Sequence, residues 1–98
     1  MSSKSMNETL LGMRNVEREI SDQIRERQGQ LPSFAWNYGR GSQAEFPDPV
    51  HLEVRVGSKR ISADWSHLWL QDSAAKPIDH MWMRQEIERI VDEFVPQP

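Results

Sequence analysis

The sequence predicts an α+β domain with two layers in the order α-β-β-β-α, in which a three-stranded antiparallel sheet packs against N- and C-terminal helices. The segment VHLEVRVGSKRISADW, residues 50–65, alternates apolar and polar positions on both sides of Gly57-Ser58, which is typical of a β-hairpin with a two-residue turn. Before and after this hairpin, apolar residues recur every three or four positions, as they do in amphipathic helices. We assign all 98 residues to one such domain, 1–98.

The first helix is expected at about residues 5–28. Ser5 and Glu8 have the spacing of a capping box, in which each side chain satisfies a free backbone N–H group at the start of a helix. Glu17 interrupts the apolar stripe that follows, and we expect its carboxylate at the edge of the buried face. Gly29 is expected as the C′ residue, and Pro32 ends the helical pattern. The apolar stripe comprises Met6, Leu10, Met13, Val16, Ile20 and Ile24.

Three strands are expected, at about residues 33–38, 50–56 and 59–65. In the first strand Phe34, Trp36 and Tyr38 share one face. The segment 39–49 contains Gly, Ser and Pro and is read as a long loop.

The Gly57-Ser58 turn sets the pairing of the last two strands. It predicts core-facing pairs Val50–Trp65, Leu52–Ala63 and Val54–Ile61. It also predicts outer pairs His51–Asp64, Glu53–Ser62 and Arg55–Arg60. Glu53 would lie diagonal to Arg60 and relieve the repulsion between the two arginines.

Residues 66–77 are expected to be a linker, whose first part, SHLWLQD, either extends the preceding strand or forms a short helical turn. The last helix follows at about residues 78–95. Its core-facing stripe comprises Met83, Ile87, Ile90, Val91 and Phe94. Ile78, Met81 and Trp82 project from the opposite side at helical spacing. Either the linker folds back and covers these three residues, or they form an exposed patch that docks a partner.

Composition excludes several classes of function. The formal net charge is −3 and no segment is strongly basic, whereas a protein that binds phosphate backbones needs a positive face. The absence of cysteine excludes disulfides, thiolate metal ligands and a cysteine nucleophile. No apolar run reaches the ~18 residues of a membrane span, and the first residues lack the apolar region of a signal peptide. We therefore expect a cytoplasmic protein without a membrane partner, cofactor or small-molecule substrate.

The residues that could carry chemistry form weak patterns. His51 opposite Asp64 is the best acid–base pair, but an open sheet face offers neither a strained nucleophile nor oxyanion donors. Asp64, His67, Asp79 and His80 have metal-binding atoms, yet the sequence contains no HExxH motif and no i,i+4 histidine pair, so no metal site is expected. We expect that the chain is not an enzyme.

The function that the sequence favours is a small non-enzymatic protein-interaction or regulatory module that binds a protein partner or associates with itself as a homodimer. The docking residues would be Ile78, Met81 and Trp82, which form the Met/Trp patch of the last helix. Three outer candidates are Trp69, Arg40 and Phe46. The alternative is a small nucleic-acid-binding protein that uses the basic hairpin tip and the preceding loop: Arg40, Arg55, Lys59 and Arg60.

Overall fold

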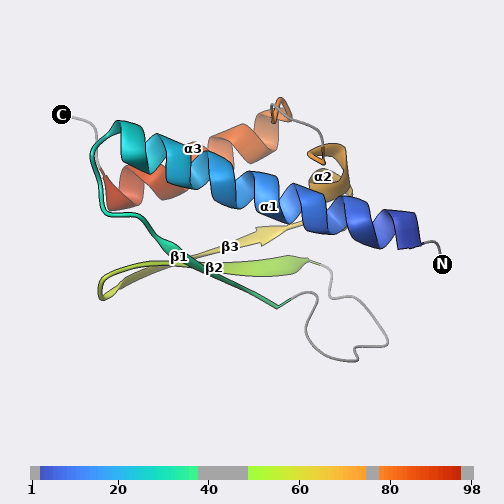
Figure 1. Ribbon diagram of the computed structural model, residues 1–98, viewed down its shortest axis with the longest axis horizontal. Helices are drawn as coiled ribbons and strands as arrows, with labels where there is room; N and C mark the ends of the chain where they lie inside the picture. The colour runs from blue at the N-terminus through green and yellow to red at the C-terminus, as the bar shows by residue number, and fades with distance from the viewer. Residues whose placement is uncertain (1–2, 38–48, 75–77, 96–98) are drawn as a thin grey trace.

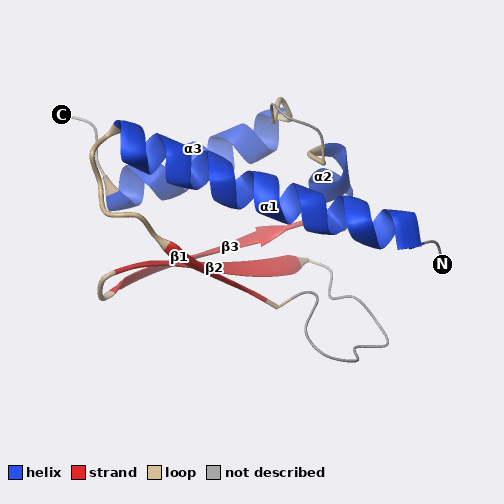
Figure 2. Ribbon diagram, in the orientation of Figure 1, coloured by secondary structure: helices blue, strands red, loops and turns tan. Residues whose placement is uncertain are grey.

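The computed structural model describes residues 3–37, 49–74 and 78–95, with side chains from residue 8 onward. Its sheet is antiparallel in the order β1-β2-β3, and the described helices lie together on one side of it (Figure 1, Figure 2). The predicted α+β fold with a three-stranded antiparallel sheet is confirmed. The elements are α1 (Ser3–Glu26), β1 (Ser33–Trp36), β2 (Val50–Val56), β3 (Lys59–Trp65), α2 (His67–Asp72) and α3 (Met81–Phe94).

The core lies between the helices and the inner face of the sheet. Every described helix and strand contributes apolar side chains to it, and even the short helix α2 adds buried Leu70 and partly buried Trp69. The fully buried side chains are Val16, Ile20, Ile24, Val50, Leu52, Val54, Trp65, Leu70, Met83, Ile87, Ile90 and Val91. The alternation of β2 and the stripes of α1 and α3 therefore meet as the sequence pattern predicts.

The end of α1 differs from the expectation that Gly29 is the C′ residue. Gln28 takes the left-handed conformation, with φ of +61°. The N–H of Gly29 donates to the carbonyl of Ile24 at 2.9 Å, and the N–H of Gln28 donates to that of Arg25 at 2.9 Å. These two bonds make a Schellman motif with Gln28 at C′ and Gly29 at C″. Gly29 packs closely against Val95 and Ile24, where a larger side chain would clash. The glycine is therefore needed at C″ rather than at C′.

Glu17 lies at the edge of the buried stripe, as expected, and its carboxylate has a specific partner. The indole Nε1 of Trp36 donates a hydrogen bond to Glu17 at 2.6 Å. Trp36 is buried, so this bond satisfies its N–H group and joins β1 to the middle of α1.

The predicted register of the hairpin is confirmed for every pair from Val50–Trp65 to Val56–Lys59. Gly57 has φ of +61°, and a glycine at the first turn position with positive φ is typical of a type II′ turn. The strand β1 ends at Trp36, two residues before the expected end, and Tyr38 lies outside the described residues.

The segment 66–77 is not only a linker, because its first part forms the helix α2. Ser66 caps α2, and its hydroxyl accepts a hydrogen bond from the N–H of Trp69 at 3.1 Å. α2 packs closely on α1, where a Cβ placed on Gly12 would lie 1.9 Å from the carbonyl oxygen of Leu70. The buried side chain of Asn15 then donates to the carbonyls of Ser73 and Ala74 at 2.8 and 2.9 Å. A serine cap and a glycine in the facing helix therefore turn the ambiguous segment into a docked helix.

The helix α3 begins at Met81, later than the expected start near residue 78. His80 is the N-cap residue in an extended conformation. Ile78 therefore precedes the helix, so the helical angle that placed it beside Trp82 does not apply. The expectation that Ile78 projects from the outer side is wrong, because its side chain is 5% exposed and belongs to the core.

Among the described residues, no helix is both long and apolar enough to cross a membrane.

Candidate interaction surface

Met81 and Trp82 form the first turn of α3 and point away from the core. Their exposed fractions are 58% and 55%, whereas Met83, the next residue, is fully buried. The helix turns by about 100° per residue, so successive positions face different directions. The hydroxyl of Ser73 lies 2.8 Å from the sulfur of Met83, which fixes the inward side of this turn against the end of α2. With Met83 held inside, the indole of Trp82 stays on the outer surface.

The helix α2 does not bury this pair. Within α2, Leu70 is buried and Leu68 is 70% exposed. Trp69 is partly buried, and its ring centroid lies 5.4 Å from that of His80. The interpretation in which segment 66–77 seals Trp82 from solvent is therefore wrong for the described part of that segment. The structure also exposes Leu68. In a helix, residues two positions apart point in nearly opposite directions, so Leu68 and Leu70 could not both face the core once this segment became helical.

Two further candidates, Arg40 and Phe46, lie outside the described residues, so the structure does not relate them to the Met/Trp patch. Of the six predicted docking residues, it brings Met81 and Trp82 to the surface and turns Ile78 inward.

The two arginines near the hairpin tip share one carboxylate within the sheet. Arg55 Nε and Arg60 Nη1 lie 3.5 and 3.3 Å from the same carboxylate oxygen of Glu53. Partial desolvation opposes the effect, but the two guanidinium groups together hold the pKa of the Glu53 carboxyl below its ordinary value of 4.5. This carboxylate relieves the Arg55–Arg60 repulsion, as the diagonal pairing predicts.

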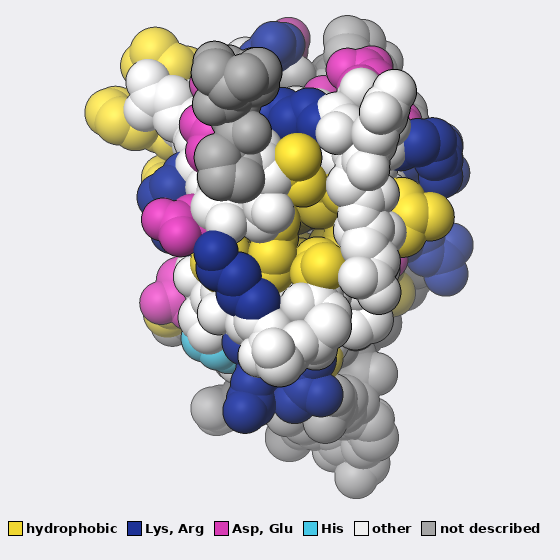
Figure 3. Space-filling view, turned by 90° about the vertical axis from the view of Figure 1, so that its left-hand side faces the viewer, with side chains coloured by type: hydrophobic (Ala, Val, Ile, Leu, Met, Phe, Trp, Pro, Cys, Tyr) yellow, Lys and Arg dark blue, Asp and Glu magenta, His cyan; other side chains and the backbone are white. Residues whose placement is uncertain are grey.

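Lys59 turns toward the end of α3. Its ammonium group donates to the carbonyl of Glu93 and lies 6.0 Å from the ring centroid of Phe94. In the view of this end of the molecule, apolar side chains are visible in a central hollow, and Lys or Arg side chains lie at parts of its border (Figure 3). The lysine thus helps to close the end of the core. The nucleic-acid alternative needs a lysine whose ammonium group is available to bind phosphate, whereas the ammonium group of Lys59 is bonded to the end of α3.

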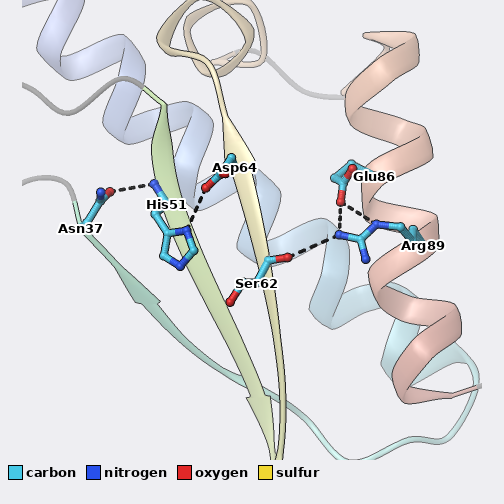
Figure 4. Close-up of polar contacts among 6 residues, drawn as sticks. All are labelled: Asn37, His51, Ser62, Asp64, Glu86 and Arg89. Atoms are coloured by element: carbon cyan, nitrogen blue, oxygen red, sulfur yellow. Dashed lines mark hydrogen bonds and ion pairs between the residues drawn. The ribbon is translucent and has the colours of Figure 1, made fainter.

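His51 and Asp64 meet on the outer face of the sheet, as their pairing predicts. His51 Nδ1 lies 2.8 Å from Asp64, and the backbone N–H of His51 donates to the side-chain oxygen of Asn37 at 2.7 Å (Figure 4). The hollow beside them, lined by Ala35, Trp36, Asn37, His51 and Glu53, measures about 160 Å³ and is open to solvent. Small-molecule sites usually measure about 300–1,000 Å³, so this geometry favours a solvated cross-strand pair. Within residues 3–37, 49–74 and 78–95, no three His, Asp or Glu side chains are grouped to hold a metal ion.

The free edge of β3 carries a contact that sequence analysis missed. Arg89 pairs with Glu86 on α3 and also donates to the backbone carbonyl of Ser62 at 3.4 Å (Figure 4). The sheet order leaves β3 at one side of the sheet, and α3 runs along that side. No local sequence signal relates residue 89 to residue 62, because the contact depends on how α3 lies over the sheet.

Comparisons of the chain with protein-family models, with curated proteins and with solved structures give no match.

Proposed function

We propose that this chain is a non-enzymatic protein-interaction module that associates with itself through the Met81–Trp82 pair at the start of α3. The observation that carries the proposal is the exposure of Trp82, 55%, on a helix that buries four other apolar side chains completely. Covering about 100 Å² of this indole would contribute about 2–3 kcal/mol. Trp and Met are also enriched at the centres of protein interfaces.

The other classes of function have weaker support. The candidate acid–base pair, His51 with Asp64, lies beside a hollow smaller than a usual ligand site. Among the basic residues of the nucleic-acid alternative that the structure describes, Arg55 and Arg60 contact Glu53, and Lys59 contacts the end of α3. A phosphate group would have to displace these contacts, which reduces the electrostatic gain of binding.

Sedimentation velocity over a range of concentrations tests the proposal on the wild-type chain, Trp82→Ala and a matched control. The control is Leu31→Ala, because Leu31 has a similar exposed fraction of 51% and lies in the connection between α1 and β1. We expect concentration-dependent association of the wild type, a weakening of at least about tenfold in Trp82→Ala, and wild-type behaviour in Leu31→Ala.

Circular dichroism and thermal melting show whether Trp82→Ala keeps its fold, as a side chain that is more than half exposed should allow. Equal association of the wild type and Trp82→Ala would contradict the proposal. Unfolding of Trp82→Ala would also contradict it, since the indole would then act in the core.

A further inference from the structure

We infer that the free edge of β3 pairs with the β3 edge of a second copy, so that two sheets join into one antiparallel sheet of six strands centred on Ser62. This inference rests on the self-association proposed above and names the strand through which it occurs. An unpaired edge strand presents backbone donors and acceptors that another strand can use. β3 is seven residues long, whereas the opposite edge strand, β1, has four.

Three residues of β3 direct their backbone groups to the free edge. In an antiparallel pair, hydrogen-bonded and non-hydrogen-bonded positions alternate. The carbonyl of His51 accepts from the N–H of Asn37, on the β1 side, so the His51–Asp64 pair is of the non-hydrogen-bonded kind. The N–H and C=O groups of Asp64 therefore point away from β2. By the same alternation, the N–H and C=O groups of Ser62 and Arg60 also point away from β2. The contact from Arg89 to the Ser62 carbonyl agrees with this direction.

The charges along this edge are self-complementary in one register. If Ser62 lies opposite Ser62 of the second copy, Arg60 lies opposite Asp64, and Asp64 lies opposite Arg60. All three are outward-facing positions, so each of these pairs can exchange backbone hydrogen bonds. Opposite charges at facing positions stabilise such a pair, and like charges destabilise it. The Asp64 carboxylate of the second copy would also lie beside the Arg55–Arg60 pair, which holds two like charges within each chain.

The helix beside this edge relates the strand to Trp82. Arg89 contacts Ser62, and Lys59 contacts the carbonyl of Glu93, so α3 and β3 run past each other in opposite directions. Trp82 lies on the same helical stripe as Arg89, two turns earlier, toward the Trp65 end of the strand. A surface groove of about 600 Å³ follows this border, lined by Lys59, Gln85, Glu88, Arg89, Asp92 and Glu93.

Pairing requires two changes at the edge of β3. The Arg89 guanidinium must leave the Ser62 carbonyl, which it holds at 3.4 Å, near the limit for a hydrogen bond. Paired strands lie about 4.8 Å apart, whereas neighbouring helices need about 8–10 Å, so each α3 must also move back from the seam. Release of Arg89 removes one of the two hydrogen bonds described above between α3 and this strand, and the bond from Lys59 to the Glu93 carbonyl remains at the other end.

Charge exchange tests the register. Arg60→Asp places Asp opposite Asp in a homodimer, and Asp64→Arg places Arg opposite Arg. Each variant alone should associate at least about tenfold more weakly than the wild type in sedimentation velocity. An equimolar mixture of the two variants should regain association, because every facing pair then joins Asp to Arg. Both residues are exposed, and circular dichroism verifies the fold of each variant.

A cysteine scan gives an independent measurement, because the chain contains no cysteine. Ser62→Cys should form a dimer with a short bismaleimide cross-linker, since facing Cα atoms in a hydrogen-bonded pair are about 5.5 Å apart. Ser58→Cys, in the exposed hairpin turn, is the matched control. Its two copies would be about 26 Å apart and should not cross-link.

The outcomes separate the two proposals. A mixture that fails to regain association, or a Ser62→Cys chain that does not cross-link, overturns the strand pairing. If Trp82→Ala abolishes association while both charge variants behave as wild type, the strand pairing is overturned and the proposed function stands. If the charge variants behave as expected and Trp82→Ala has no effect, the strand pairing stands and the role of the Met81–Trp82 pair is overturned.

Discussion

Gly12→Ala is the change for which the structure predicts the opposite of the usual result. Replacing a glycine inside a helix by alanine ordinarily stabilises the helix by about 1 kcal/mol. Here an alanine Cβ would lie 1.9 Å from the carbonyl oxygen of Leu70 and 2.6 Å from its carbonyl carbon. Both atoms belong to the backbone of α2, so no side-chain rotation relieves the contact.

The size of the effect follows from the overlap. Carbon–oxygen contacts normally measure about 3.3 Å or more, so α1 and α2 would have to separate by about 1.4 Å. Overpacking of a close contact costs about 1–3 kcal/mol, and occasionally more. A displacement of this size also disturbs the bonds from Asn15 to the Ser73 and Ala74 carbonyls. Disturbance of these hydrogen bonds costs about 1 kcal/mol, which offsets the gain in helix propensity, so we expect a net loss of about 1–3 kcal/mol in the free energy of unfolding.

Urea unfolding and thermal melting measure this loss. For a chain of this size, a loss of about 1–3 kcal/mol lowers the Tm by roughly 5–20 °C. Arg14→Ala, at an exposed position of the same helix, is the control and should change the free energy of unfolding by less than about 0.5 kcal/mol. A Gly12→Ala chain that is as stable as the wild type, or more stable, would refute the close approach of α1 and α2.

Two further predictions concern the end of α1 and the outer face of the sheet. Gln28→Gly should raise the free energy of unfolding by about 0.5–1 kcal/mol in urea denaturation, because Gln28 holds φ of +61° and glycine adopts this conformation without strain; a decrease would contradict the Schellman geometry. Arg60→Gln should raise the pKa of the Glu53 carboxyl toward 4.5 in an NMR titration, since Arg60 is one of the two cations that lower it. Because the folded pKa is below the unfolded value, the stability that this carboxylate contributes is complete above the unfolded pKa and is lost as the pH falls through the folded one. An unchanged Glu53 pKa in Arg60→Gln would contradict the ion pair.

The sequence predicted the hairpin in detail because its determinants are local. A two-residue turn beginning with glycine allows few pairings, and the period of two then assigns every residue to a face. For this reason the His51–Asp64 pair and the position of Glu53 near Arg60 could both be predicted without coordinates.

The helices were predicted less completely because their ends depend on contacts distant in sequence. The docking of α2 requires Gly12, which is 58 residues before Leu70 and gives no local signal for that contact. Helical spacing gave the correct inner face of α3, but it could not show that the helix begins after His80. The contact between Arg89 and Ser62 could not be predicted, because it depends on the placement of α3 beside the sheet.

The residue at which α3 begins determines which apolar side chains near its start are buried in the core and which are exposed. A helix that began at residue 78 would expose Ile78 together with Met81 and Trp82, and one continuous apolar patch would result. With the start at Met81, Ile78 packs inside, and the exposed indole belongs to the stripe that continues through Glu86 and Arg89 along the edge of β3. In the proposed dimer, this indole lies beside the edge of β3, where the backbone groups of Arg60, Ser62 and Asp64 point away from β2 and pair once Arg89 leaves the Ser62 carbonyl. In that proposed dimer, pairing of the two β3 edges would set the register, and Trp82 would contribute buried apolar area.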